Sequence, residues 1–396
     1  MNGKTSQISL LTAGRDRPYA LGLAAALAAA GVRLDFIGSD EVDAPELRAS
    51  PYIRVLNLRG EQSAAAGWPR KAARVLGYYA RLLRYMLTAR PRVLHILWNN
   101  KFELFDRTAL MLFYRLLGKR IVLTVHNVNT RARDGCDSRL NRATLRFQYR
   151  RCDHLFVHTG KMQAELISSY GVPAARVTVI PFGLNRTVPD TALTPAAARE
   201  RLGLAPADKV LLFFGNIAPY KGVEYLVQAF LELASRRADY RLVIAGRPKG
   251  SEAYWADLER KIQASAFRDR FRLRIEFVPD AETEIYFKGV DILILPYRRI
   301  FQSGVLFLGY NFGLPCIAAD VGSLKEEIVE GRTGWMSPPE DVTGLIGAIE
   351  RHFDSELYAH REVRRSEIRA YAQERYSWAK VAALTADVYA ELAPPR

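Results

Sequence analysis

The chain of 396 residues has few cysteines and no long apolar run. Its three cysteines, Cys136, Cys152 and Cys316, are far apart and show neither a pairing pattern nor the spacing of a metal site. We therefore expect no disulfide bond and no metal, and this cysteine usage favours a reducing cytoplasm. Residues 20–32 form an apolar stretch that is too short to span a bilayer. Residues 1–6 lack a signal-peptide pattern, so we expect a cytoplasmic protein.

Acidic residues are scarce in the first half of the chain. Residues 1–185 contain 28 Lys and Arg against 13 Asp and Glu, which accounts for the whole net charge of +15. A charge excess confined to one half indicates that this half faces an anionic partner. Anionic lipid and nucleic acid are the two candidates that composition leaves open.

Short apolar runs alternate with helical patterns along the chain, which predicts βαβ units and parallel sheets. The pattern stops between Pro181 and Pro195, where prolines and a glycine indicate a linker, and then resumes. We predict an α/β protein of two doubly wound, Rossmann-like domains facing a central cleft. Its expected parts are a first domain (residues 1–185), a second domain (186–372) and a C-terminal helix (373–396) that crosses back to the first domain.

One loop of the second half has the parts of a diphosphate site. Residues 215–222, Gly-Asn-Ile-Ala-Pro-Tyr-Lys-Gly, follow an apolar run and precede a predicted helix. Such a turn offers backbone N–H groups and a positive helix end, and Lys221 adds a mobile cation. A plain strand-to-helix turn is the alternative.

Three further loops follow predicted strands of the second half, and the last of them runs into a helix at Gly304. Ser303 and Gly304 are expected at its N-terminus, where N–H groups and the helix dipole favour an anion. Lys221 and this helix end would clamp a diphosphate without a metal, since no closely spaced aspartates follow a strand. The predicted donor-binding residues are Gly14, Gly215, Asn216, Lys221, Arg247, Val278, Tyr297, Gln302, Ser303, Gly304 and Val305.

The second half resembles the nucleotide-sugar domain of the GT-B-fold glycosyltransferases of family 4. The resemblance covers residues 207–350 and rests on the order and spacing of several segments: Phe213-Phe214-Gly215, Lys221-Gly222, Ala245-Gly246, Asp291 to Pro296 and Gly313-Leu314-Pro315. It implies a nucleotide sugar as co-substrate, UDP- or GDP-linked, and no further cofactor.

Three positions depart from the family pattern. The family carries two glutamates eight positions apart, where this chain has Ile300 and Leu308, and it carries an arginine where this chain has Asn216. The remaining Gln302-Ser303-Gly304 is similar to a subgroup that includes bacterial exopolysaccharide (xanthan-type) mannosyltransferases. Family 4 enzymes retain the anomeric configuration and the xanthan-type enzymes invert it, so both outcomes stay open.

The first half resembles the acceptor domain of these enzymes through two strand-end loops. The first loop contains Gly14, Arg15 and Asp16, and the second contains His126 and Asn127. Asp16 and His126 are the candidates for a general base, and Lys221 would stabilise the leaving diphosphate. The predicted acceptor-binding residues are Arg15, Trp98, Asn99 and Asn127, since aromatic rings stack on sugars and amides bond their hydroxyls.

The stretch from Trp68 to Arg92 interleaves arginines with Tyr78, Tyr79 and Tyr85. A basic, aromatic, amphipathic helix suits an anionic membrane surface, and the alternative is an ordinary solvated face. We expect a peripheral protein on the inner face of the plasma membrane, with a glycan or a lipid-diphosphate-linked acceptor and no nucleic-acid partner.

The predicted activity is sugar transfer from a nucleotide diphosphate sugar to a sugar hydroxyl in bacterial polysaccharide or glycoconjugate synthesis. A sugar-nucleotide epimerase of the same fold would need carboxylates around the sugar, and Ile300 and Leu308 stand where they are expected. A non-catalytic scaffold of the fold is the other alternative.

Overall fold

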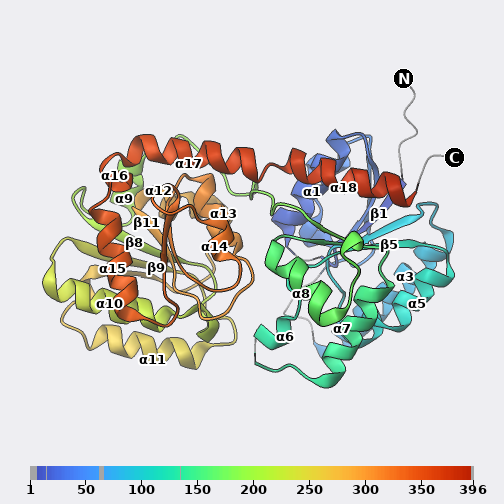
Figure 1. Ribbon diagram of the computed structural model, residues 1–396, viewed down its shortest axis with the longest axis horizontal. Coiled ribbons are helices and arrows are strands. Elements are labelled where there is room, and N and C mark those ends of the chain that lie inside the picture. The colour runs from blue at the N-terminus through green and yellow to red at the C-terminus, as the bar shows by residue number, and fades with distance from the viewer. Residues whose placement is uncertain (1–6, 15, 62–66, 134, 394–396) are drawn as a thin grey trace. The chain divides into compact units, whose positions relative to one another are not determined.

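The computed structural model describes residues 7–14, 16–61, 67–133 and 135–393. The chain divides into two compact units (Figure 1). Unit 1 consists of Met1–Gly183 together with Tyr376–Arg396, and unit 2 consists of Leu184–Arg375. Among the described residues, no helix is both long and apolar enough to cross a membrane.

Unit 1 is built on a parallel sheet in the order β3-β2-β1-β4-β5-β6-β7. Its strands are β1 (Gln7–Leu11), β2 (Arg33–Gly38), β3 (Ile53–Asn57), β4 (Val93–Ile96), β5 (Arg120–Thr124), β6 (His154–Val157) and β7 (Val177–Val179). Its helices are α1 (Arg17–Ala29), α2 (Pro45–Arg48), α3 (Trp68–Thr88), α4 (Glu103–Arg107), α5 (Ala109–Leu116), α6 (Thr130–Arg133), α7 (Arg139–Arg151), α8 (Gly160–Tyr170) and α18 (Trp378–Leu392). Strands β4 and β6 are buried along their whole length, as expected of parallel strands with both faces covered.

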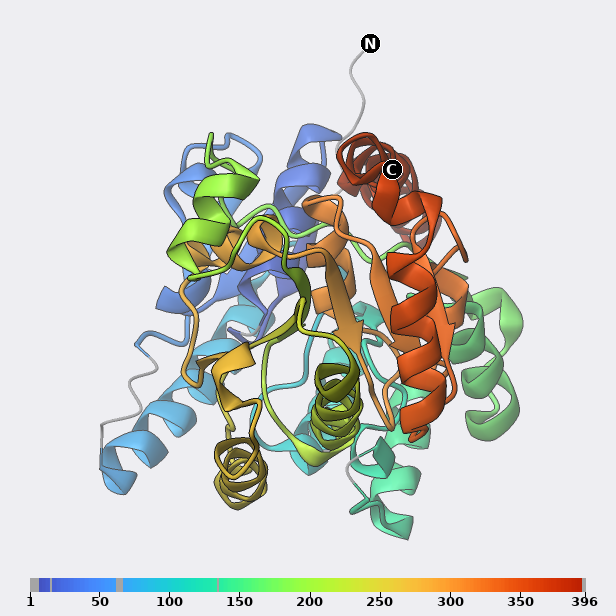
Figure 2. The same ribbon diagram turned by 90° about the vertical axis from the view of Figure 1, so that its left-hand side faces the viewer.

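Unit 2 is built on a second parallel sheet in the order β10-β9-β8-β11-β12-β13. Its strands are β8 (Lys209–Phe214), β9 (Tyr240–Ala245), β10 (Phe271–Arg274), β11 (Ile292–Leu295), β12 (Cys316–Ala319) and β13 (Gly334–Ser337). Its helices are α9 (Pro195–Arg201), α10 (Val223–Arg236), α11 (Glu252–Gln263), α12 (Asp280–Gly289), α13 (Gly304–Asn311), α14 (Leu324–Glu327), α15 (Val342–Phe353), α16 (Glu356–Ala359) and α17 (Arg361–Arg375). Figure 2, with unit 2 toward the viewer, shows helices flanking its strands.

Helix α18 returns the end of the chain to unit 1, where it packs against α1. Trp378 is 2% exposed and lies over Gly22 and Gly183, because a Cβ atom at either glycine would fall within its ring. The hydroxyl of Tyr389 lies 2.5 Å from Nδ1 of the buried His95 in β4. These contacts make α18 part of the core of unit 1.

The structure confirms the predicted fold class and differs in local detail. Residues 105–117 have a helical pattern that predicts one helix, but the structure divides it into α4 and α5 at Thr108, whose backbone is non-helical and whose hydroxyl donates to the Leu104 carbonyl. Strand β13 and helix α9 escaped prediction. Both are short, and β13 begins with a glycine, so neither has a hydrophobic period to detect.

Candidate active site

The loops after β8, β9 and β11 approach one another closely at the carboxyl edge of the unit 2 sheet. A Cβ atom on Gly246 would overlap the Gly215 carbonyl, and one on Gly222 would overlap the Pro296 carbonyl. Gly222 has φ 64° and forms the N-cap of α10. The glycines therefore allow a backbone packing that holds the Lys221 loop against the loop that leads to α13.

Lys221 is buried, not a mobile cation as its sequence context suggested. Its side chain is part of the protein interior at 6% exposure, and its Nζ lies 2.7 Å from the hydroxyl of Tyr297 and 4.2 Å from the centre of that ring. A cation over a tyrosine face is stabilised by the ring as well as by the hydroxyl. The ammonium group is therefore fixed in position by the residue that follows β11 and Pro296.

The same hydroxyl connects Lys221 to the start of α13. Tyr297 Oη lies 3.2 Å from Oγ of Ser303, the residue before the first helical residue, Gly304. Ser303 is buried and makes no side-chain cap to its own helix. Lys221, Tyr297 and Ser303 thus form one hydrogen-bonded chain, which we call the lysine relay, that ends at a positive helix terminus.

Gln302 lies next to this relay and has an unsatisfied amide. Both polar atoms of its side chain are buried, and neither has a hydrogen-bond partner in the described part of the chain. A buried polar group without a partner costs free energy unless a water or ligand satisfies it. On α13 itself, Val305 lies beside Gly215, so the helix start and the Lys221 loop adjoin.

The remaining residues predicted to bind the donor differ in what they can offer. Asn216 is exposed, and Arg247 is exposed with its guanidinium 5.4 Å from the ring centre of Phe277. The side chain of Val278 is buried, which leaves its backbone as the accessible part. Arg298, a further candidate to stabilise a diphosphate, is instead paired with Glu340 at 3.1 Å.

In unit 1, the first loop turns from β1 into α1 around Gly14 and Asp16. Asp16 caps α1 by accepting a hydrogen bond of 3.3 Å from the Tyr19 amide, in a left-handed conformation with φ 44°. Asp16 is partly exposed to solvent. The protein atoms around its carboxyl group nevertheless desolvate it, which raises its pKa. Arg15 lies outside the described residues.

His126 stands at the end of β5 in an aromatic cluster. Its ring is parallel to that of Trp98, with centres 4.3 Å apart and planes at 1°, and the ring of Tyr19 is nearly perpendicular to it, with centres 4.7 Å apart. Its Nδ1 is 3.1 Å from Nε2 of His158, which follows β6. Burial lowers the pKa of His126 well below the usual range and that of His158 to about 4, so both rings are neutral at pH 7.

His158 is a partner that sequence reasoning missed. Its place directly after β6 puts it at the same sheet edge as His126, and this is the signal that could have found it. Nε2 of His126 is buried and has no partner in the described part of the chain. His126 therefore keeps one ring nitrogen for a hydrogen bond that the described residues do not supply.

The residues predicted to bind the acceptor are only partly available. One face of Trp98 is covered by His126. The amide of Asn99 exchanges two hydrogen bonds with that of Gln148, at 3.1 and 2.7 Å, which ties α7 to the end of β4. One N–H and one lone pair of the Asn99 amide remain for a further partner. Asn127 is half-buried, and its side chain makes no hydrogen bond to another described residue.

No group of three or more His, Cys, Asp or Glu side chains with metal-binding geometry occurs within the described ranges. Of the two positions that lack the family glutamates, Leu308 in α13 is buried at 7% exposure and Ile300 is half-buried, and neither side chain can form a hydrogen bond. Hydrogen bonds at this end of α13 therefore have to come from residues 302–304 and the lysine relay.

Two family models match the chain in succession. "Glycosyltransferase Family 4" matches residues 18–188, and "Glycosyl transferases group 1" matches residues 208–355. Each model covers less than half of the chain, and the two together show that its halves are similar to glycosyltransferases of family 4 and of group 1. The first match lies within unit 1 except for its last residues, and the second lies within unit 2.

Two curated relatives that the chain is similar to are named as glycosyltransferases. The chain is 31% identical over 244 residues to D-inositol 3-phosphate glycosyltransferase 2 of Catenulispora acidiphila, covering 60% of this chain and 56% of the relative. It is also 31% identical over 245 residues to the D-inositol 3-phosphate glycosyltransferase of Streptomyces bingchenggensis, covering 60% and 53%. The chain spans about half the length of the curated relatives it matches. The xanthan-type subgroup stays a prediction.

Solved structures resemble the whole chain in fold. Sucrose-phosphate synthase from Thermosynechococcus elongatus superposes with a TM-score of 0.77 at 20% identity, covering 98% of this chain and 99% of that one. HepE from Anabaena in complex with UDP-glucose gives 0.73 at 15% identity, covering 98% and 99%. These likenesses confirm the GT-B fold.

Proposed function

We propose that this protein transfers a sugar from a UDP- or GDP-linked nucleotide sugar to a hydroxyl group of a glycan or lipid-linked acceptor. Bacterial polysaccharide or glycoconjugate synthesis is the setting that the chemistry suits. The proposal draws on the family, on the UDP-glucose bound to its structural relative HepE, and above all on the lysine relay of unit 2.

The lysine relay is the observation that carries the proposal. When the bond between sugar and phosphate breaks, the leaving diphosphate gains negative charge, and a preorganised cation and helix end stabilise that charge. Lys221 is held at 2.7 Å from Tyr297, so little reorganisation is needed as charge develops. These parts would serve a diphosphate without a metal.

Gln302 would form hydrogen bonds with the sugar of the donor. An amide offers both a donor and an acceptor to a hydroxyl group, and this one has no partner within the described residues. It would take over hydrogen bonding that the family assigns to the glutamates missing at Ile300 and Leu308. Because both family glutamates are missing, the proposal includes membership of the xanthan-type subgroup and an inverting reaction.

The acceptor hydroxyl would meet unit 1. An inverting reaction needs a general base, and Asp16 and His126 are its candidates. Asp16 is the first candidate, since it is exposed to solvent. His126 is the second: its buried Nε2 has no partner in the described part of the chain, but burial lowers its pKa and makes it a weaker base than an ordinary histidine. Since relatives are named for an inositol phosphate acceptor, an acceptor screen should include inositol phosphates beside glycans.

Lys221→Ala tests the donor assignment. With a donor found by a thermal-shift screen of nucleotide sugars, sugar transfer and donor hydrolysis should fall by a factor of about 100 to 1,000, the loss seen when one charge-stabilising donor is removed. Lys325→Ala removes an exposed lysine of the same unit and should leave both rates unchanged. Equal rates for Lys221→Ala and Lys325→Ala would refute the donor site, and an epimerised free donor would point to the epimerase alternative.

An anionic membrane is the partner we propose for the face of α3. Tyr78 and Tyr79 point into the core and are only 3% and 6% exposed, which corrects the expectation that the aromatic residues of this helix meet lipid. The exposed apolar residues are Trp68, Leu76 and Leu87. The exposed arginines of α3 are Arg70, Arg81 and Arg84. A face that mixes apolar and basic side chains complements an anionic bilayer.

Vesicle flotation tests this partner. Trp68→Ser with Leu76→Ser should reduce binding to vesicles containing phosphatidylglycerol, because both apolar anchors are lost. Phe277→Ser with Val363→Ser, two exposed apolar residues of unit 2, is the matched control. Equal retention of the two variants would remove the membrane from the proposal while leaving transfer to a soluble acceptor untouched.

A further inference from the structure

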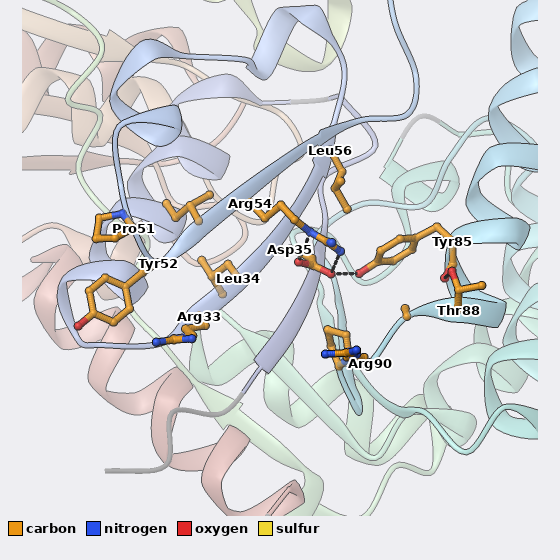
Figure 3. A pocket seen from close by; sticks show the side chains of 13 residues that line it. Arg33, Leu34, Asp35, Pro51, Tyr52, Arg54, Leu56, Tyr85, Thr88 and Arg90 are labelled. Carbon is orange, nitrogen blue, oxygen red and sulfur yellow. Dashed lines mark hydrogen bonds and ion pairs between the residues drawn. The ribbon is translucent and has the colours of Figure 1, made fainter. Parts of the chain in front are cut away.

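One cavity of unit 1 lies at the edge of the sheet where the strands begin. The candidate site residues of unit 1 lie at the opposite edge, where the strands end. The volume of the cavity is about 610 Å³, within the range of small-molecule sites. It is lined by the first residues of β2 and β3, the end of α3 and the loop that leads into β4 (Figure 3). Gly14, Trp98 and His126 follow the last residues of β1, β4 and β5, so parallel strands separate the two places.

The charged groups of this cavity fall into two sets. Arg54 donates to both carboxylate oxygens of Asp35, at 2.9 and 2.7 Å, and Tyr85 donates to the same carboxylate at 2.6 Å. Arg54 and Asp35 therefore neutralise each other. Arg33 and Arg90 make no ion pair or side-chain hydrogen bond with any described residue, and Figure 3 shows both away from the Asp35 group.

Two uncommitted guanidinium groups at one cavity suit a dianion. A guanidinium binds phosphate oxygens with two parallel hydrogen bonds, and a phosphate monoester carries close to two negative charges at neutral pH. The rest of the lining is largely apolar, with Pro51, Leu34 and the half-exposed ring of Tyr52. This part would accept the organic group attached to the phosphate.

We propose that this arginine pocket binds a phosphate monoester at a site separate from the donor site. The recognised group is the phosphate dianion, held by Arg33 and Arg90, with Tyr52 packing on the organic portion. The phosphate can come from a small soluble ester or from the headgroup of an anionic lipid such as phosphatidic acid. The site does not depend on the proposed transferase activity.

The test uses the full chain in a Lys221→Ala background, which disables the other candidate phosphate site. In a soluble arm, glycerol 3-phosphate binding is measured by calorimetry. In a vesicle arm, flotation is measured on phosphatidylcholine with and without phosphatidic acid. The pocket variant Arg33→Gln/Arg90→Gln is compared with Arg139→Gln/Arg176→Gln, which removes the same charge from two exposed arginines outside the pocket.

We expect the pocket variant to bind at least about tenfold more weakly than the control, since two charge-assisted hydrogen-bonding groups are lost. A loss in the soluble arm identifies a soluble ester, and a loss confined to the phosphatidic acid vesicles identifies a lipid headgroup. Equal binding by the two variants in both arms overturns the proposal. Thermal unfolding and donor transfer, measured with Lys221 restored, should be the same for both variants.

Discussion

Gly222→Ala should damage unit 2 through one backbone contact. Gly222 has φ 64°, and a Cβ atom there would come closer than 3.0 Å to the carbonyl oxygen of Pro296. The left-handed backbone costs an alanine about 1–2 kcal/mol, and overpacking in a rigid environment adds about 1–3 kcal/mol. We therefore expect a loss of about 2–5 kcal/mol in the free energy of unfolding of unit 2.

Gly250→Ala is the matched control, since Gly250 also has a positive φ, 74°, yet its Cβ would meet nothing within 4 Å. The difference between the two variants isolates the contact with Pro296. At about 2–4 °C per kcal/mol for a domain of this size, the unfolding midpoint of Gly222→Ala should lie about 2–12 °C below that of Gly250→Ala, measured by calorimetry.

The folded fraction of Gly222→Ala should also be a poorer enzyme. The chain can relieve the clash only by separating the loop of Lys221 from that of Tyr297, and a misplacement of about 1 Å costs on the order of 100-fold in rate. Transfer is measured well below both midpoints. If the two alanine variants unfold together and turn over alike, the close packing of these loops is not what holds the lysine relay.

Two further predictions concern unit 1. Gly183→Ala should lower its unfolding midpoint because the Trp378 ring occupies the space of the new methyl group, and in a double-mutant cycle with Trp378→Phe the losses should be less than additive; strict additivity would contradict the contact. Asp106 is buried, and desolvation raises its pKa from 3.8 to about 6. Between these pH values the folded state binds a proton that the unfolded state lacks. The free energy of unfolding should therefore fall by about 3 kcal/mol as the pH rises from about 4 to about 6. Denaturant unfolding of wild type and Asp106→Asn across this range should show the difference, and parallel pH profiles would exclude it.

Much of the fold can be predicted from the sequence, because parallel α/β units have strong local patterns of apolar residues. The uninterrupted apolar segments 292–295 and 316–319 predict strands, and the periodic segment 342–353 predicts a helix; β11, β12 and α15 have these bounds. The loop from Gly215 to Gly222 and the helix start at Gly304 are likewise where their residues predict them. Glycines and strand ends are local signals that need no tertiary information.

Local signals cannot state which side chains from distant segments meet. The contact of Lys221 with Tyr297 spans 76 residues, and that of His126 with His158 spans 32. Both depend on strand order, since β8 lies beside β11 and β5 beside β6. Burial of Lys221 follows from this packing, which is why the sequence suggested a mobile cation.

The sequence by itself determined the chain of strands and helices, the excess of positive charge in residues 1–185 and the residue types at the strand ends, because these are properties of neighbouring residues. Tertiary structure alone decided that Tyr78 and Tyr79 turn inward, that Asp35 neutralises Arg54, and that Arg33 and Arg90 stay uncommitted beside a cavity. The sequence shows which side chains are charged or polar. Whether such a side chain is available to a ligand depends on which partners the fold brings within hydrogen-bonding distance.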